Sequence, residues 1–168
     1  PKWCEATPKF GLSSHYHISF LTFKENYPDI EFDILHLDEY FLIANKHIDV
    51  AIRDLFLKQK YDIVFISLMW GSNLNPSINS YEIIKNSNSK IVFLWPDLHF
   101  DWGVKELDNL DKFSDLHVSY HDIDHNFPMN IQNKLLVVWA AVSDTIFYPT
   151  CEENKTIEIS FIGSTRHN

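Results

Sequence analysis

The stretch KIVFLWPDLHFDWG, Lys90 to Gly103, passes within a few residues from an apolar run to side chains that can do chemistry. The apolar run, Ile91 to Trp95, contains no polar residue, which is typical of a strand covered on both faces in a parallel sheet. Pro96 follows, and a proline cannot donate a backbone hydrogen bond to a neighbouring strand. The sequence therefore predicts a buried strand that ends at Pro96 and continues into a loop.

The predicted loop carries four side chains that could contact a ligand: Asp97, His99, Asp101 and Trp102. In open α/β sheets, ligands bind in the crevice beyond the carboxyl ends of the strands, where this loop would lie. The alternative is that Asp97 only caps a turn and that His99 is an ordinary solvated loop residue. The residues of this stretch leave both interpretations open.

Strands and helices alternate along the whole chain. Apolar runs and alternating patterns predict strands over 29–37, 61–69, 91–95, 115–120 and 134–141. Helical spacing predicts helices over 16–27, 45–60, 78–84 and 104–113, the third of them capped by Asn75 and Pro76. Strands separated by helices are typical of βαβ units. We therefore predict a Rossmann-like, doubly wound α/β domain, with a parallel sheet and helices on both faces.

Composition and charge exclude several classes of protein. The 168 residues suit one domain, and the formal charge of −9 argues against a nucleic-acid partner, because binding phosphates requires clustered Lys and Arg. Cys4 and Cys151 form no CxxC pair, so we expect neither a disulfide framework nor a thiolate zinc site. The apolar runs fall short of the roughly 18 residues of a membrane span. These features predict a cytoplasmic protein without a membrane span.

Three histidines raise the question of a metal site. His117, His121 and His125 have the spacing that would place three imidazoles on one face of a helix. His117, however, lies within a predicted strand, and the segment from His121 to His125 has the composition of a loop. The spacing is therefore interpreted as accidental, and no metal site is predicted.

Both ends of the sequence suggest a larger protein. A doubly wound domain opens with a strand before its first glycine turn, whereas PKWCEATPKF, which precedes Gly11, is a poor core strand. Near the other end, TIEISFI, 156–162, predicts a new strand after a polar linker. We expect an N-terminal domain over 1–150, and over 151–168 a linker and the first strand of a truncated second domain.

Two segments near the C-terminus, AAVSDTIFYP (140–149) and ISFIGSTRHN (159–168), resemble the domain junction of GT-B fold glycosyltransferases. They are most similar to the spore-maturation CgeB-like proteins and the group-1 glycosyltransferases. In that family the first domain ends in a strand and a small-residue segment with an Asp and an aromatic-Pro pair, here Asp144, Phe147 and Pro149. The second domain opens with a strand and a Gly-Ser turn followed by Arg, here Phe161, Gly163, Ser164 and Arg166.

The resemblance covers essentially the whole chain through short motifs, including the segments 94–97 and 114–116. It implies a hexosyltransferase-like enzyme that transfers a sugar from a nucleotide-sugar donor to a carbohydrate or other glycan acceptor, without a metal or other cofactor. It also implies that this chain, as the N-terminal half of a GT-B fold, supplies the acceptor side and the hinge. Because the family's second domain provides most donor contacts, the isolated chain is expected to be inactive.

The resemblance assigns roles to the candidate residues. Asp97 or His99 would accept the acceptor's proton if the enzyme inverts configuration, with Asp101 as the orienting partner. Gly11 and Ser13 would approach the donor phosphates, since only Gly lets a backbone come so close. The other substrate-binding candidates are Trp102, whose indole could stack on a sugar, Asp144 at the junction, and Gly163, Ser164 and Arg166 in the family turn. An ordinary tight turn is the alternative for each glycine.

A second class of function stays open at this point, namely a non-enzymatic α/β domain that binds a ligand or a protein. A receiver-like domain would need an acidic pair after its first strand, an Asp at the end of its third and a Lys after its fifth. The sequence offers Asp97 but neither of those features. A receiver-like domain is therefore disfavoured, and a sugar-binding module stays open.

Overall fold

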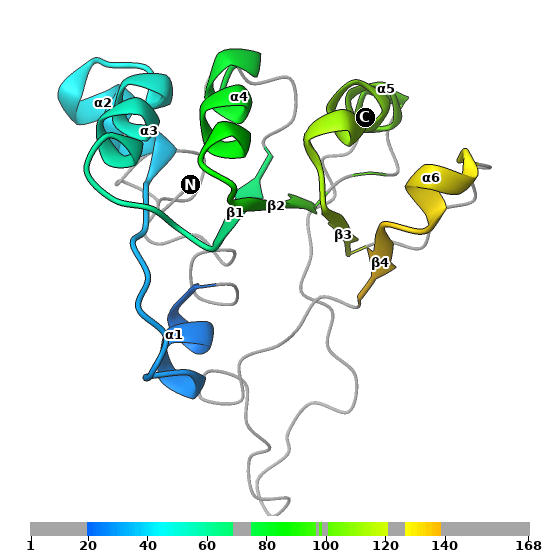
Figure 1. The fold of residues 1–168 in the computed structure, drawn as a ribbon, viewed down its shortest axis with the longest axis horizontal. Coiled ribbons are helices and arrows are strands. Elements are labelled where there is room, and N and C mark those ends of the chain that lie inside the picture. The colour runs from blue at the N-terminus through cyan, green and yellow to red at the C-terminus, as the bar shows by residue number, and fades with distance from the viewer. Residues whose placement is uncertain (1–19, 69–74, 97, 99–100, 121–126, 139–168) are drawn as a thin grey trace, which may run out of the picture.

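The computed structural model describes residues 20–68, 75–96, 98, 101–120 and 127–138. Within them, four strands form one parallel sheet: β1 (Ile63–Ser67), β2 (Lys90–Trp95), β3 (Leu116–Ser119) and β4 (Leu135–Val137). Their order in the sheet, β1-β2-β3-β4, follows their order in the sequence. The predicted α/β, Rossmann-like fold with a parallel sheet is therefore confirmed (Figure 1).

Six α-helices and one 3₁₀ helix accompany the sheet in the described residues: α1 (Thr22–Asn26), α2 (Leu37–Ala44), α3 (Ile48–Phe56), α4 (Ile78–Asn86), α5 (Asp101–Leu110), η4 (Asp111–Phe113) and α6 (Met129–Gln132). Parallel crossovers are right-handed, so a sheet whose order follows the sequence has its connecting helices on one face. Figure 1 shows α3, α4 and α5 in a row on that side and α1 on the other side. The rings of Phe23 in α1 and Phe65 in β1 lie 6.4 Å apart, so helices flank both faces.

The best-packed part of the core lies between β2 and the helices. Ile91 and Phe93 are fully buried, and Val92, on the opposite face of β2, is only 7% exposed. The ring of Tyr81 from α4 meets the ring of Phe93 edge to face at 5.4 Å. β2 is therefore covered on both faces, as its unbroken apolar run predicted.

The start of α4 depends on a carboxylate from another helix. Asp49 of α3 accepts hydrogen bonds from the Ser77 backbone N–H at 2.9 Å and from the Ser80 hydroxyl at 2.7 Å. Burial alone would raise the pKa of Asp49, but these hydrogen bonds and the nearby His47 lower it below its ordinary value. The predicted cap at Asn75 is therefore wrong, because Ser77 is the N-cap of α4 and its backbone N–H donates to Asp49.

The predicted strand over 29–37 is also wrong. Residues 31–36 form no ladder with any described strand, and the chain enters α2 at Leu37. Asp38 and Glu39 lie in the first turn of α2, where acidic side chains favour a helix N-terminus. The alternating segment packs by its side chains instead: the ring of Phe32 lies 5.8 Å from that of Phe23, and Asp33 accepts a hydrogen bond from the Tyr61 hydroxyl.

The remaining predicted elements that the structure describes are confirmed, with bounds that differ from those predicted. The helix predicted over 45–60 is α3, and the strands predicted over 61–69 and 115–120 are β1 and β3. Of the strand predicted over 134–141, β4 covers Leu135–Val137, and residues 139–141 lie outside the described residues. The predicted domain boundary near 150 and the predicted strand over 156–162 also lie outside them.

Candidate functional site

The carboxyl ends of the four strands meet at one edge of the sheet. Trp95 at the end of β2 is in register with Ser119 of β3, and Ser119 is in register with Val137 of β4. Pro96 follows Trp95 directly, so the segment after β2 begins at the edge where ligands bind in open α/β sheets. This edge is the candidate functional site, as the sequence predicts.

Most of the candidate residues lie outside the described part of the chain. These are Asp97 and His99 of the loop, Gly11 and Ser13 of the first turn, and Asp144, Gly163, Ser164 and Arg166 of the predicted junction. Their roles in catalysis or binding therefore stay predictions. Asp97 is nevertheless close to the candidate edge in sequence, since only Pro96 separates it from the last residue of β2.

The structure places Asp101 and Trp102 in a helix, whereas the sequence predicted a loop for both. They are the first two residues of α5, and Asp101 is exposed in its first turn. An acidic residue is favourable there because the N-terminus of a helix carries a partial positive charge. The helix thus begins earlier than the predicted start at Val104, and Val104, Leu107 and Leu110 form its apolar face. The segment between β2 and α5, which contains Asp97 and His99, is therefore shorter than the predicted loop.

A buried polar network that the sequence did not predict lies just inside this edge. His117 of β3 has no exposed surface, and its Nδ1 lies 3.0 Å from Nε1 of Trp95. An indole N–H can only donate, so Nδ1 must accept and the proton of the neutral ring must be on Nε2. That nitrogen lies 3.3 Å from Oδ1 of Asp111 in η4, the acceptor for its proton. The network therefore fixes one tautomer of His117.

Asp111 connects the network to α6 and to the start of β4. Its Oδ1 accepts from Nζ of Lys134 at 3.1 Å, its carbonyl oxygen accepts from the same ammonium at 3.0 Å, and its Oδ2 accepts from Asn130 at 2.8 Å. Burial alone would raise the pKa of Asp111, but the hydrogen bonds from Lys134, Asn130 and His117 lower it. The ionised carboxylate thus joins η4, β3, α6 and the start of β4.

A histidine beside a carboxylate resembles a catalytic acid–base pair, but His117 uses both of its ring nitrogens to hold neighbouring side chains in place. Both ring nitrogens of His117 already have partners, and the ring is stacked on Phe93 with the centroids 5.9 Å apart. Burial lowers the pKa of His117, although Asp111 acts in the opposite direction. His117 is therefore neutral and has no exposed atom that could take a substrate's proton.

The sequence contained one signal for this network. His117 occupies an inward position of the strand predicted over 115–120, and a buried polar side chain requires a hydrogen-bond partner. The residues that supply its partners, Trp95 and Asp111, are not marked in the sequence by any motif.

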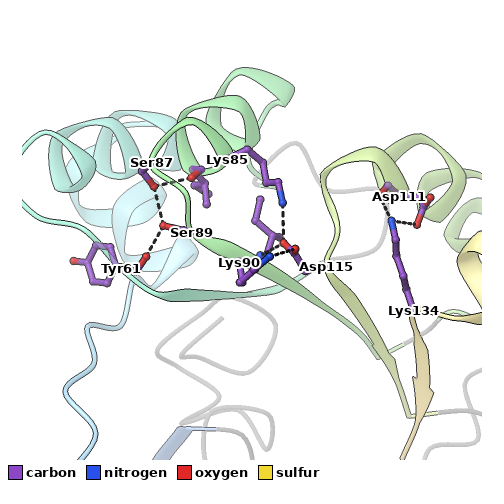
Figure 2. Close-up of polar contacts among 10 residues, drawn as sticks. Tyr61, Lys85, Ser87, Ser89, Lys90, Asp111, Asp115 and Lys134 are labelled. Carbon is purple, nitrogen blue, oxygen red and sulfur yellow. Dashed lines mark hydrogen bonds and ion pairs between the residues drawn. The ribbon is translucent and has the colours of Figure 1, made fainter.

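A second polar cluster lies at the opposite edge, at the amino ends of the strands (Figure 2). Asp115 accepts hydrogen bonds from the backbone N–H of Ile91 at 2.9 Å, from Lys85 at 2.8 Å and from Lys90 at 3.1 Å. Burial would raise the pKa of Asp115, but these contacts lower it to about 2. Because the carboxylate replaces a missing ladder acceptor at the start of β2, we interpret the cluster as stabilising the sheet.

Asp115→Asn is expected to destabilise the protein by about 1–2 kcal/mol at pH 7, because the lowered pKa measures how strongly the fold favours the ionised form. The side chain is 25% exposed, so part of the effect is screened. The stabilisation is present above the unfolded value of 3.8 and is lost as the pH falls through about 2. Urea unfolding of both proteins at several pH values measures the difference.

The matched control for Asp115 is Glu82→Gln, which removes an exposed carboxylate from α4. It should change stability by less than about 0.5 kcal/mol. Equal losses of stability in the two variants would mean that the contacts of Asp115 with Lys85, Lys90 and Ile91 stabilise the fold no more than an exposed carboxylate does.

Comparisons with other proteins leave the function to be inferred from the chain itself. No protein-family model, curated protein or solved structure matches it.

Within the described ranges, no helix has the length and apolar character to cross a membrane. The same residues contain no group of three or more His, Cys, Asp or Glu side chains placed to hold a metal ion.

Proposed function

We propose that this chain is the acceptor-side domain of a GT-B fold glycosyltransferase. In this proposal a cytoplasmic, hexosyltransferase-like enzyme moves a sugar from a nucleotide-sugar donor to a carbohydrate or other glycan acceptor. The observation that supports it most is the end of β2 at the carboxyl edge of a parallel sheet, because Pro96 and Asp97 follow Trp95 directly there. A sheet of this type serves many functions, so the resemblance near 140–168 is what favours sugar transfer.

The proposed chemistry needs a base on one side of the reacting sugar and an anion site on the other. The acceptor hydroxyl oxygen forms a bond to the anomeric carbon, and its proton passes to Asp97 or His99. The bond from that carbon to the donor's diphosphate breaks at the same centre. The Gly163-Ser164 turn and Arg166, together with Gly11 and Ser13, would stabilise the negative charge of the departing nucleoside diphosphate.

The direct test is transfer by the full-length protein. UDP-, GDP- and dTDP-sugars would be incubated with it and with a panel of mono- and oligosaccharide acceptors, and release of the nucleoside diphosphate would be measured together with the glycosylated product. Release that depends on both donor and acceptor supports the proposal. Reversible sugar binding without any turnover across the panel would instead support the non-enzymatic sugar-binding domain.

Residues 1–168 alone should bind nucleotide-sugars no more tightly than about millimolar, which corresponds to only about 4 kcal/mol. In the proposed arrangement, the second domain makes most donor contacts, and this chain contacts the diphosphate mainly through backbone N–H groups. Each of these hydrogen bonds contributes roughly 0.5–1.5 kcal/mol net. Association costs several kcal/mol in lost freedom, and the net charge of −9 repels an anion at long range. Calorimetric titration with the same donors measures the affinity, and micromolar binding would place the donor site within these residues.

A further inference from the structure

The hydrogen bond between Trp95 and His117 can form in only one protonation state of the histidine. Nε1 of Trp95 lies 3.0 Å from Nδ1 of His117, and an indole nitrogen has a proton to donate but no lone pair to accept with. A proton on Nδ1 would place two N–H donors against each other at this distance. Proton uptake at Nδ1 therefore requires the Trp95 side chain to leave its present position.

Among the described residues, few charged groups lie near His117 to offset such a proton. Asp111 of η4 would attract it across the 3.3 Å contact, whereas Lys134, whose ammonium lies 3.1 Å from the same carboxylate oxygen, would oppose it. The other elements on this side contribute neutral groups: Asn130 of α6 binds Asp111, and burial keeps Tyr81 of α4 protonated by raising its pKa. Glu106 of α5 acts on Tyr81 rather than on the histidine. Of the groups in the described ranges, Trp95, Asp111 and Lys134 therefore act most directly on the protonation of His117.

The position of Trp95 gives this contact a consequence at the candidate site. Trp95 is 1% exposed, is the last residue of β2 and is followed directly by Pro96. Its ring also lies 6.1 Å from the ring of Phe93, so its side chain is part of the packed core. A movement of the Trp95 side chain would therefore disturb the end of β2, where the segment with Asp97 and His99 begins.

We propose that His117 is a pH-sensitive positioning residue: in its neutral form it holds Trp95 at the carboxyl end of β2, and its protonation releases Trp95. The proposal goes beyond sugar transfer and does not depend on it, because it concerns the position of a strand end in any ligand-binding α/β domain. The lowered pKa of His117 agrees with the geometry, since uptake of the proton costs a hydrogen bond and buries a charge. Release is accordingly expected below the range in which an ordinary histidine titrates.

Nuclear magnetic resonance of protein labelled with ¹⁵N at His and Trp directly tests the protonation state of His117 and its hydrogen bond with Trp95. At neutral pH, His117 should be the tautomer with its proton on Nε2, and the indole N–H of Trp95 should exchange slowly with solvent. On acidification, the Trp95 signal should shift or lose its protection with the same midpoint as His117. A proton on Nδ1 at neutral pH, or a Trp95 signal that stays unchanged while His117 titrates, would overturn the proposal.

Two variants on β2 separate the effect of the Trp95 hydrogen bond on the pKa of His117 from the effect of packing. Trp95→Phe removes the indole donor, whereas Phe93→Leu changes a ring whose centroid is also 5.9 Å from that of His117 but leaves both of its hydrogen bonds. Trp95→Phe should shift the His117 midpoint upward, towards that of an ordinary histidine, and Phe93→Leu should shift it less. Equal upward shifts would mean that packing, and not the indole donor, governs the titration.

A second measurement covers the case in which acid unfolds the protein before His117 titrates. A histidine whose pKa is lowered by folding makes the protein less stable as the pH falls below the unfolded value of about 6.5. The free energy of unfolding should therefore fall less steeply with decreasing pH in Trp95→Phe than in Phe93→Leu. Slopes that are the same in both variants would contradict the proposal without any need to resolve the histidine signal.

Discussion

If the proposed sugar transfer is correct, Asp97→Asn or His99→Ala in the full-length protein is expected to lower turnover by roughly a hundredfold or more, whichever of the two is the general base. In the proposed mechanism, the acceptor hydroxyl must lose its proton as it attacks the sugar, and these two residues follow β2 in the sequence. Removing the base should leave donor binding unchanged, since the donor's nucleotide is proposed to contact other residues. Initial rates with saturating donor and acceptor measure the loss.

Folding and general charge are controlled separately in this experiment. Asp108→Asn removes an exposed carboxylate from α5, outside the proposed site, and should leave turnover at the wild-type value. Circular dichroism and urea unfolding should show that each variant retains the wild-type fold. Wild-type turnover in both Asp97→Asn and His99→Ala would remove these residues from the mechanism and would leave the loop after β2 without a catalytic role.

Phe93→Ala is expected to destabilise the protein by about 3–5 kcal/mol, the usual cost of removing a fully buried aromatic ring. Phe93 has no exposed surface, and its ring packs between Tyr81 at 5.4 Å and His117 at 5.9 Å. The truncation leaves a cavity at the centre of the best-packed layer. Since domains of this kind are stable by only about 5–15 kcal/mol, urea unfolding should show a large fall in the midpoint.

Phe65→Ala provides the matched control for that prediction. Phe65 is also a strand phenylalanine, on the neighbouring β1, but it faces α1 and is 50% exposed. Removing it takes less apolar surface out of the core, so a loss of about 1 kcal/mol is expected. A loss as large as that of Phe93→Ala would show that the face covered by α1 contributes as much to stability as the face covered by α4.

The accuracy of the sequence-based prediction differed between elements for a physical reason. β2 was predicted closely because five consecutive apolar residues must be covered on both faces, wherever the neighbours come from. The existence of α5, though not its start, was predicted in a similar way, because Val104, Leu107 and Leu110 share one face by local spacing alone. The segment 29–37 shows the limit: its alternation favours an extended chain, but a strand also requires a partner, and residues 31–36 pair with no described strand.

For the candidate site, the sequence determined the edge of the sheet at which to look, because Pro96 must end β2 and parallel strands end together. It did not determine that Asp101 and Trp102 begin a helix, since the start of α5 depends on how the apolar face meets the core. Only the tertiary structure brings together Trp95, His117 and Asp111. These residues come from β2, β3 and η4, and no local pattern encodes a hydrogen bond between groups that meet only when the sheet and its helices have packed.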